Sequence, residues 1–339
     1  MSFLKINNIS KSFNGHIALN DINLSINKGN IYALLGESGS GKSTLMRIVA
    51  GLLDADQGEI FLAEKEITGP KNHLVAGYEE IKLVSQDFDL FPHHSVVENI
   101  LYPLRKYKDS YQEYRLNSML KLCKLESYVS KIPSALSGGE QQRVALACAL
   151  ASEPALILLD EAFSHIDAIF RQVLKNVLVE ISNNTSTTLC LVTHESIDAL
   201  SIADEIAILK RGKILQKDSP KVIYQHPTKK YVAQLMGEIN TIKKRTALQL
   251  TEINPELLTN KTIIIRPEHL KIVALEDTPF HGKIKNIRLM GPYFRLELTI
   301  PSEKEFIIVF SSQDIFTKNE VVGLKCNSDK LILIEKNLS

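Results

Sequence analysis

The glycine-rich segment GESGSGKST, residues 36 to 44, has the residue types and spacing that hold phosphate. It matches the pattern G-x-x-x-x-G-K-[ST], in which backbone N–H groups and a helix start point at phosphate oxygens. Lys42 would bridge the β- and γ-phosphates, and the Ser43 hydroxyl would reach Mg²⁺. The alternative is a flexible glycine turn with a solvated lysine, but a strand before the segment and a helix after it favour phosphate binding. The other residues predicted to shape or line the loop are Gly36, Ser38, Gly39, Gly41 and Thr44.

Four polar side chains follow apolar runs that have the pattern of buried strands. Asp160 ends the run ALILLD, and a carboxylate at the carboxyl end of a parallel strand can hold hydrated Mg²⁺. Glu161 comes next and could accept a proton from the water that attacks a γ-phosphate. His194 ends TTLCLVTH, where its imidazole could donate to the γ-phosphate, and Gln86 could reach Mg²⁺ or the attacking water. Alone, the acidic pair would indicate a helix cap and the histidine a solvated strand end; beside the phosphate loop, they predict a catalytic site.

A second glycine pair lies in LSGGEQQR, residues 136 to 143. Ser137, Gly138 and Gly139 precede the helical run EQQRVALACAL, so a hydroxyl and backbone N–H groups would stand at a helix start and form a second anion site. The alternative is a plain helix cap, with Glu140 completing a capping box. The whole LSGGEQQR segment, shortly before LILLDE, is longer than a cap requires.

The elements that must position these residues are those of an α/β nucleotide-binding domain. Three short apolar runs, at 31–36, 155–160 and 187–194, are typical of strands buried on both faces of a parallel sheet. Helical periodicity follows or precedes them at 44–53, 140–153 and 170–182. Because such a sheet needs cover on both faces, we expect helices on each side of it.

Length and charge narrow the class of protein further. A chain of 339 residues exceeds one usual core, so two domains are expected. With 40 Lys and Arg against 39 Asp and Glu, the net charge of +1 argues against binding driven by a nucleic acid backbone or an anionic membrane. The four scattered cysteines have no metal-ligand spacing and fit reduced thiols in a cytosolic protein. We find neither a signal peptide nor an apolar run that could span a membrane.

The pattern changes after about residue 240. Strand-like segments separated by turn residues follow one another, and Phe294, Leu296, Leu298 and Ile300 alternate on one face. We therefore predict an α/β domain over residues 1–238, with a helical subdomain at about 88–153, and a smaller all-β, OB-like barrel over residues 239–339.

Taken in their order along the chain, these motifs resemble those of the ATP-binding cassette (ABC) family of transport ATPases, over roughly residues 2 to 237. The resemblance implies that GESGSGKST is Walker A, Gln86 the Q-loop, LSGGEQQR the signature, LILLDE Walker B and His194 the H-loop. SHID at 164–167 is similar to the D-loop, of which we carry over Asp167 but not His165. Phe13 resembles the aromatic residue that stacks on adenine, although a core phenylalanine is the open alternative.

In this family two cassettes pack head to tail, and the signature of one completes the nucleotide site of the other. The resemblance therefore implies ATP and Mg²⁺ as cofactors and a second ATPase subunit, expected to be identical. The C-terminal segments IRPEHLKIV and HGKIKNIRL resemble the transport-associated (TOBE) domain of importer ATPases. This implies separate membrane permease subunits, a solute-binding protein acting indirectly, and a place at the cytoplasmic face of the membrane.

The tail most resembles that of ferric iron and polyamine importers, so one of these solutes is expected. Two alternatives stay open. A soluble cassette could act on ribosomes or nucleic acid, although it would usually carry two cassettes or a long coiled coil. The C-terminal barrel could also sense a solute and inhibit transport.

Overall fold

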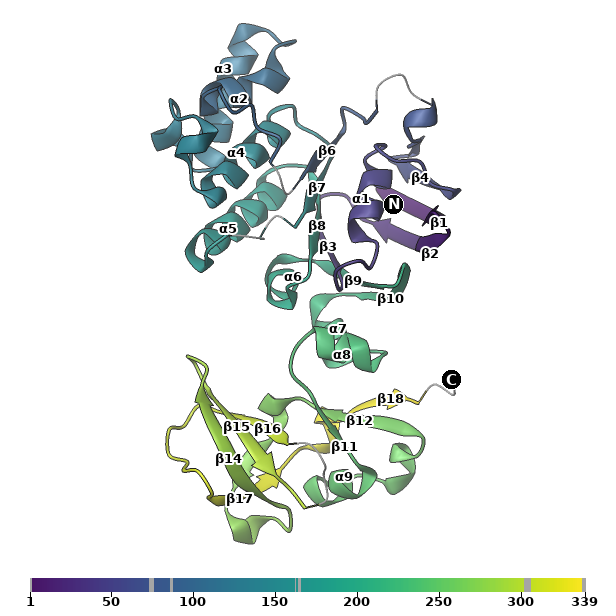
Figure 1. Cartoon of the computed structure of the whole chain (residues 1–339), viewed down its shortest axis with the longest axis vertical. Helices are drawn as coiled ribbons and strands as arrows, with labels where there is room; N and C mark the ends of the chain where they lie inside the picture. The colour runs from purple at the N-terminus through teal and green to yellow at the C-terminus, as the bar shows by residue number, and fades with distance from the viewer. Residues whose placement is uncertain are drawn as a thin grey trace. The chain divides into compact units, whose positions relative to one another are not determined.

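The computed structural model describes residues 2–72, 76–85, 88–161, 163, 166–301 and 306–336. The chain divides into two compact units, residues 1–221 and 222–339, each with its own core (Figure 1). Within the described ranges, no helix combines the length and the apolar character needed to cross a membrane.

A six-stranded sheet forms the centre of the first unit, in the order β10-β9-β3-β8-β7-β6. Its parallel strands are buried, and alternate residues of β7 and β8 enter two different cores: Ile157 and Leu191 face one, whereas Leu158 and Cys190 face the other. This alternation explains why the runs are nearly all apolar, and it confirms the predicted α/β class. The strands are β3 (Ile31–Leu35), β6 (Ile81–Val84), β7 (Leu156–Asp160), β8 (Thr188–Thr193), β9 (Glu205–Lys210) and β10 (Lys213–Asp218).

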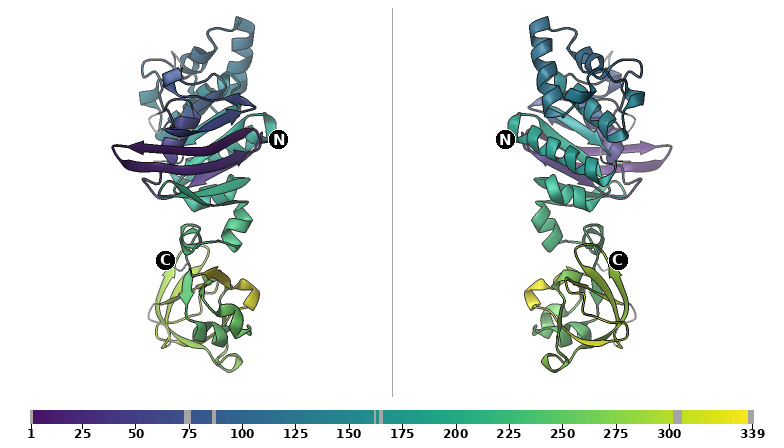
Figure 2. Two further views of the ribbon diagram at one scale, coloured as in Figure 1. Left: turned by 90° about the vertical axis from the view of Figure 1, so that its right-hand side faces the viewer. Right: turned by 90° about the vertical axis from the view of Figure 1, so that its left-hand side faces the viewer.

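A second, antiparallel sheet of four strands was not anticipated from the sequence. It has the order β2-β1-β4-β5 and shares a core with helix α1 (Lys42–Val49) and one face of the central sheet. The views in Figure 2 show β1 and β2 on one side of the central sheet and α5 on the other. Helix α1 is therefore enclosed by two sheets. The strands are β1 (Leu4–Phe13), β2 (His16–Ile26), β4 (Gln57–Leu62) and β5 (Lys65–Glu66).

Helices cover the opposite face of the central sheet. Apolar residues of α4 and α5 pack on β7 and β8, and α2 and α3 extend the same core. The helices predicted at 140–153 and 170–182 correspond to α4 and α5. The bounds are α2 (Val96–Leu101), α3 (Asp109–Leu122), α4 (Gly138–Ala151), α5 (Ala168–Asn184) and α6 (Ser196–Ile202).

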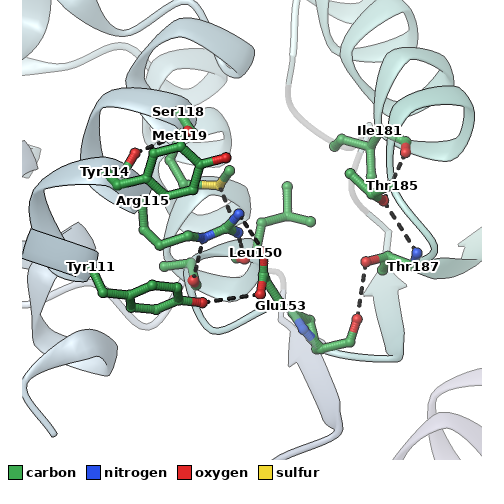
Figure 3. Close-up of polar contacts among 12 residues, drawn as sticks. Tyr111, Tyr114, Arg115, Ser118, Met119, Leu150, Glu153, Ile181, Thr185 and Thr187 are labelled. Atoms are coloured by element: carbon green, nitrogen blue, oxygen red, sulfur yellow. Dashed lines mark hydrogen bonds and ion pairs between the residues drawn. The ribbon is translucent and has the colours of Figure 1, made fainter. Parts of the chain in front are cut away.

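A buried arginine joins α3 to the end of α4 (Figure 3). The Arg115 guanidinium donates to the carbonyl oxygens of Leu150 and Ala151, at 2.8 and 3.0 Å, and forms an ion pair with Glu153 at 2.8 Å. The last carbonyls of a helix lack their usual partners within it, and the arginine supplies donors there, in addition to the backbone N–H of Glu153 that donates to Leu150 O at 3.0 Å. The Tyr111 hydroxyl donates to the other oxygen of Glu153. Helix α4, which begins at the second glycine pair, is thus fixed at its far end.

Replacing Arg115 by methionine is expected to lower the free energy of opening of α3 by about 2–4 kcal/mol, because methionine restores the volume but none of the hydrogen bonds. Hydrogen exchange of peptides covering residues 109–122 would measure this. Lys121→Met, at an exposed position on the same helix, is the matched control and should change the free energy of opening by no more than about 0.5 kcal/mol. Equal exchange in both variants would contradict the role given to Arg115.

The second unit is a β structure built from two antiparallel sheets, which confirms the predicted β-rich domain. The sheets have the orders β11-β12-β18 and β13-β17-β14-β15-β16. Leu296 and Leu298 of β15 are fully buried, as the alternation of that segment indicated. The strands are β11 (Asn240–Ile242), β12 (Lys261–Ile265), β13 (Lys271–Val273), β14 (His281–Leu289), β15 (Phe294–Thr299), β16 (Ile307–Ser311), β17 (Val321–Lys325) and β18 (Ile332–Glu335), with one helix, α9 (Lys244–Leu250), between β11 and β12.

The second unit begins at Val222, earlier than the domain boundary that we predicted after residue 238. Arg266, which is fully buried, provides the physical reason. Its guanidinium donates to the carbonyl oxygens of Tyr224 and Ala233, so helices α7 (Pro220–Gln225) and α8 (Lys230–Leu235) are held by the β unit. The segment that the sequence placed at the end of the first domain therefore packs largely with the second.

Candidate functional site

The segment 36–44 forms a tight loop between β3 and α1. Gly41 has φ 107° and precedes the helix, and a Cβ there would lie 2.5 Å from the carbonyl oxygen of Ala18. Lys42 is buried, and its Nζ donates to the carbonyl oxygens of Gly36 and Glu37, both at 2.8 Å. The loop thus wraps around the lysine ammonium, as a phosphate-binding loop requires. Gly36 is buried, Ser38 and Gly39 are exposed at the top of the loop, and Gly41, Ser43 and Thr44 are half-buried at the helix start.

Two residues that are far apart in the sequence, Ser43 and Asp160, meet beside this loop. The Ser43 hydroxyl donates to Asp160 Oδ1 at 3.2 Å. Burial raises the pKa of Asp160 against the opposing effect of that hydrogen bond, and burial lowers the pKa of Lys42 despite the nearby carboxylates. In both groups burial disfavours the charged form. A phosphate anion beside Lys42 and a cation beside Asp160 would stabilise the charged forms.

The donor set also fits Mg²⁺. This ion is usually held by one or two carboxylates together with substrate phosphates and water, and Asp160 and Ser43 supply one carboxylate and one hydroxyl. In the parts of the chain that the structure describes, no three His, Cys, Asp or Glu side chains gather to hold a metal by themselves. Gln86, the third predicted ligand, lies outside the described residues.

Glu161 and His194 lie at the carboxyl edge of the sheet, after the neighbouring strands β7 and β8. The backbone N–H of Glu161 donates to Val192 O at 3.1 Å, and Glu161 has φ 53°, which turns the chain sharply at this point. His194 Nδ1 is 3.8 Å from Glu161 Oε1, and His194 Nε2 is 3.6 Å from Glu195 Oε1. Glu161 and His194, two of the three predicted catalytic residues, line one cavity of about 220 Å³. The structure thus places a carboxylate and an imidazole, two groups that can take part in general acid–base catalysis, at the same edge of the sheet.

The second glycine pair stands at the start of α4, on the other sheet face from α1. Ser137 and Gly138 are exposed. The capping box of the alternative interpretation is present: Glu140 N–H donates to Ser137 Oγ at 3.4 Å, and Ser137 N–H donates to Glu140 Oε2 at 2.7 Å. A Cβ on Gly139 would lie 2.9 Å from Phe170 Cβ, so this glycine lets α4 approach α5. Ser137 therefore caps α4, and the exposed Ser137 and Gly138 at this helix start can be reached by an anion on another molecule.

Two further predicted residues have clear surroundings. Phe13, at the end of β1, is 44% exposed, which excludes the core alternative. The Lys11 ammonium lies 5.4 Å from the centroid of its ring. Asp167 caps α5, because its Oδ1 accepts from the N–H groups of Ile169 and Phe170 at 2.9 and 3.1 Å. Ser164 and His165 of the same segment lie outside the described residues.

Sequence reasoning missed the charged side chains behind Glu161 and His194. Arg171, Asp198 and Thr193 line the same cavity, and Lys175 contacts Asp198. The sequence pattern that could have indicated this cluster is Arg171 and Lys175 at positions i and i+4 on one helix face, together with Asp198 in the first helical turn after His194.

Comparisons with known proteins agree with this arrangement. Residues 19–164 match the family model of the ABC transporter, and residues 263–334 match the TOBE domain. The chain is 36% identical to the sulfate/thiosulfate import ATP-binding protein CysA of Halalkalibacterium halodurans, over 98% of this chain and 96% of that protein. It is 34% identical to the glucose import ATP-binding protein GlcV of Saccharolobus solfataricus, over 98% and 99%. The Fe(3+) ions import ATP-binding protein FbpC 2 of Haemophilus influenzae is 37% identical, over 88% of both chains.

Solved structures agree for the first unit. One is the dimeric post-hydrolysis state of an ATP-binding cassette bound to ADP and Pi, with a TM-score of 0.57 and 28% identity, over 64% of this chain and 98% of that one. Another is a protein from Clostridium perfringens that is part of an ABC transporter complex, with a TM-score of 0.62 and 28% identity, over 66% and 90%. Taken with the phosphate loop and the acidic edge of the sheet, these similarities show that the chain belongs to the ABC transporter family, as an importer-type ATPase with a C-terminal TOBE domain.

Proposed function

We propose that this chain powers solute uptake as one of two ATPase subunits that close on ATP at the cytoplasmic face of a membrane, beneath separate permease subunits. The observation that carries the proposal is the exposed start of α4 at Ser137 and Gly138. Ser137 caps α4, and this helix lies on the opposite face of the sheet from α1. A second subunit can bring such a helix start to the nucleotide that Lys42 and Ser43 hold. The dimeric state of the solved cassette bound to ADP and Pi supports this assembly.

The residues divide the chemistry between them. Lys42 and the loop N–H groups would bind the β- and γ-phosphates, and Ser43, Asp160 and Gln86 would hold Mg²⁺. The metal supplies charge neutralisation on the phosphates. Glu161 would accept the proton of the attacking water, while His194 donates to the γ-phosphate.

Closure would then follow from contacts that only the dimer makes. Ser137, Gly138 and Gly139 of one subunit would donate to the γ-phosphate bound by the other, with Asp167 at the shared boundary. Since ATP hydrolysis removes the group that these donors contact, the closed state loses its stabilisation after each turnover.

For the transported solute we propose ferric iron or a polyamine, on the resemblance of the tail. The relatives named above import sulfate/thiosulfate, glucose and Fe(3+), at 34 to 37% identity, so identity does not rank these solutes. The solute is bound by the permease and the solute-binding protein in this proposal, and a transport assay must decide it.

The test is reconstitution of the chain with candidate permeases and binding proteins in proteoliposomes. ATP-dependent accumulation of radiolabelled ferric iron or spermidine is expected, with sulfate and glucose as parallel arms. Accumulation of sulfate or glucose alone would replace the proposed solute. ATPase stimulation by RNA or DNA, and by no permease, would instead favour the soluble nucleic acid or ribosome function.

Stacking of adenine on Phe13 can be tested separately. Phe13→Ala is expected to weaken ATP binding about tenfold, because the exposed ring supplies a π face to the base, whereas Phe13→Tyr should keep the affinity. Fluorescent nucleotide titration measures the effect. Tyr114→Ala removes another exposed aromatic ring, 64% exposed on α3, and is expected to leave binding unchanged. Full affinity in Phe13→Ala would place the base elsewhere.

A further inference from the structure

A buried ionic cluster joins α5 to α6 behind the catalytic edge of the sheet. The Asp198 side chain is 1% exposed, and Lys175, 8% exposed, places Nζ 2.7 Å from Asp198 Oδ1. Arg171 Nη1 lies 3.8 Å from Asp198 Oδ2. Apart from these ion pairs, neither Asp198 oxygen has a hydrogen-bond partner among the described residues. Charge attraction is therefore what compensates the burial of this carboxylate.

The cluster touches the two segments that carry the catalytic residues. Asp198 belongs to the first turn of α6, which begins directly after the segment of His194 and Glu195. On the other side, Arg171 Nη2 donates to the carbonyl oxygen of Phe163 at 3.2 Å, two residues after Glu161. The positions of Glu161 and His194 are thus connected through one buried carboxylate and one arginine.

The catalytic residues and the ionic cluster line the same cavity. Glu161 and His194 line it together with Arg171 and Asp198. Glu161 and His194 approach each other only to 3.8 Å, which is too long for a hydrogen bond. The backbone of their strand ends is fixed by β7–β8 pairing and by the Glu161 N–H to Val192 O hydrogen bond at 3.1 Å. The cluster adds a side-chain constraint between the segments that follow these strand ends.

We infer that Asp198 is a positioning residue, which holds the His194 segment against the Glu161 segment through Arg171 and Lys175. The inference rests on the proposed roles of Glu161 and His194 in ATP hydrolysis. Asp198 does not contact the nucleotide in this account. It acts by keeping the acid and the imidazole at one spacing while the dimer opens and closes.

The test is steady-state ATP hydrolysis by the full-length Asp198→Asn variant, which keeps the side-chain shape and removes its charge. We expect kcat to fall about tenfold while KM for ATP stays within about twofold, because binding depends on the loop at 36–44 and not on this cluster. A role in stability alone would lower the fraction of active enzyme, and nucleotide titration would detect that loss.

A double variant keeps the inference falsifiable if Asp198→Asn is unstable. Lys175→Met with Asp198→Asn removes the charge pair together, so no unpaired lysine is left buried and the thermal midpoint should recover. We expect kcat to stay low, because Arg171 still lacks its carboxylate. Recovery of kcat together with the thermal midpoint would overturn the inference, as would wild-type kcat in a folded Asp198→Asn variant.

Glu205→Gln is the matched control. It breaks another ion pair between neighbouring elements, Lys217 to Glu205 at 3.1 Å on β10 and β9, and should leave kcat within about twofold. Glu161→Gln in the same assay separates the two claims. If that variant keeps full turnover, the proposed catalytic role fails; if it loses turnover while Asp198→Asn does not, only the positioning inference fails.

Discussion

Replacement of Glu161 by glutamine is expected to lower ATP turnover by about 10²- to 10⁴-fold and to leave ATP binding nearly unchanged. Glutamine has the same shape but cannot accept a proton, so the attacking water loses its base. Glu161 lies at the carboxyl edge of the sheet, 3.8 Å from the imidazole of His194, and Lys42 and Ser43 remain intact in the variant. Phosphate release measures the loss of turnover, and nucleotide titration measures binding.

The same variant should accumulate a closed dimer. With hydrolysis blocked, the γ-phosphate that joins the two subunits is retained, so gel filtration in Mg²⁺ and ATP should show the dimer and gel filtration in ADP the monomer. Glu180→Gln, an exposed acid far along α5, is the control and should turn over at the wild-type rate. Wild-type turnover in Glu161→Gln would remove this residue from the proposed role.

Ser137→Arg is expected to abolish ATP-dependent dimer formation and turnover while the isolated monomer binds ATP as before. Ser137 is exposed at the start of α4 and would meet the partner's γ-phosphate in the closed dimer. A long arginine side chain leaves no space for that contact. ATP binding by the monomer needs only the loop at 36–44, so titration should detect no change. Sedimentation with ATP measures the loss of the dimer.

The substitution also removes a helix cap, which itself costs about 1 kcal/mol, and a control must separate this effect. Ser95→Arg provides it, because Ser95 forms the same kind of capping box with Glu98 at the start of α2. That variant should lose a cap and still form the ATP dimer. If Ser137→Arg monomers turned over ATP at the wild-type rate, the shared site would be contradicted.

Mixing two inactive variants tests the shared site directly. A subunit with Lys42→Ala has a damaged phosphate loop and an intact signature, and a Ser137→Arg subunit has the reverse. A mixed dimer therefore contains one fully intact site, and we expect the mixture to recover ATP-dependent dimerisation that neither variant shows alone. Lack of recovery would indicate that both features serve the same nucleotide within one chain.

The features that the sequence predicted well are those that a short segment specifies. Gly41 adopts φ 107°, a conformation that few other residues tolerate, and the adjacent Lys42 and Ser43 follow by helix geometry. Buried parallel strands are recognisable because both of their faces are apolar. The capping box of Ser137 and Glu140 spans one turn, so its spacing was enough to offer it as the alternative to an anion site.

The sheet made by β1, β2, β4 and β5 was missed for a different reason. Its strands alternate apolar and polar residues only in part, and β1 pairs with β4, far along the chain, through an antiparallel ladder that shifts register between Asn7 and Ser10. Which residues of β1 are covered depends on α1 lying beneath them. The same dependence decided Phe13, whose exposure could not be separated from core packing before the strands were placed.

The sequence by itself determined the family, the phosphate loop and the order of the motifs, because each depends on neighbouring residues whose backbone geometry is local. Only the tertiary structure decided which distant side chains meet: Ser43 with Asp160, Glu161 with His194, and Asp198 with Lys175 and Arg171. These pairs come from different strands and helices, and their distances depend on how the apolar faces of the sheet and helices pack. A pattern of residue types carries no measure of that packing.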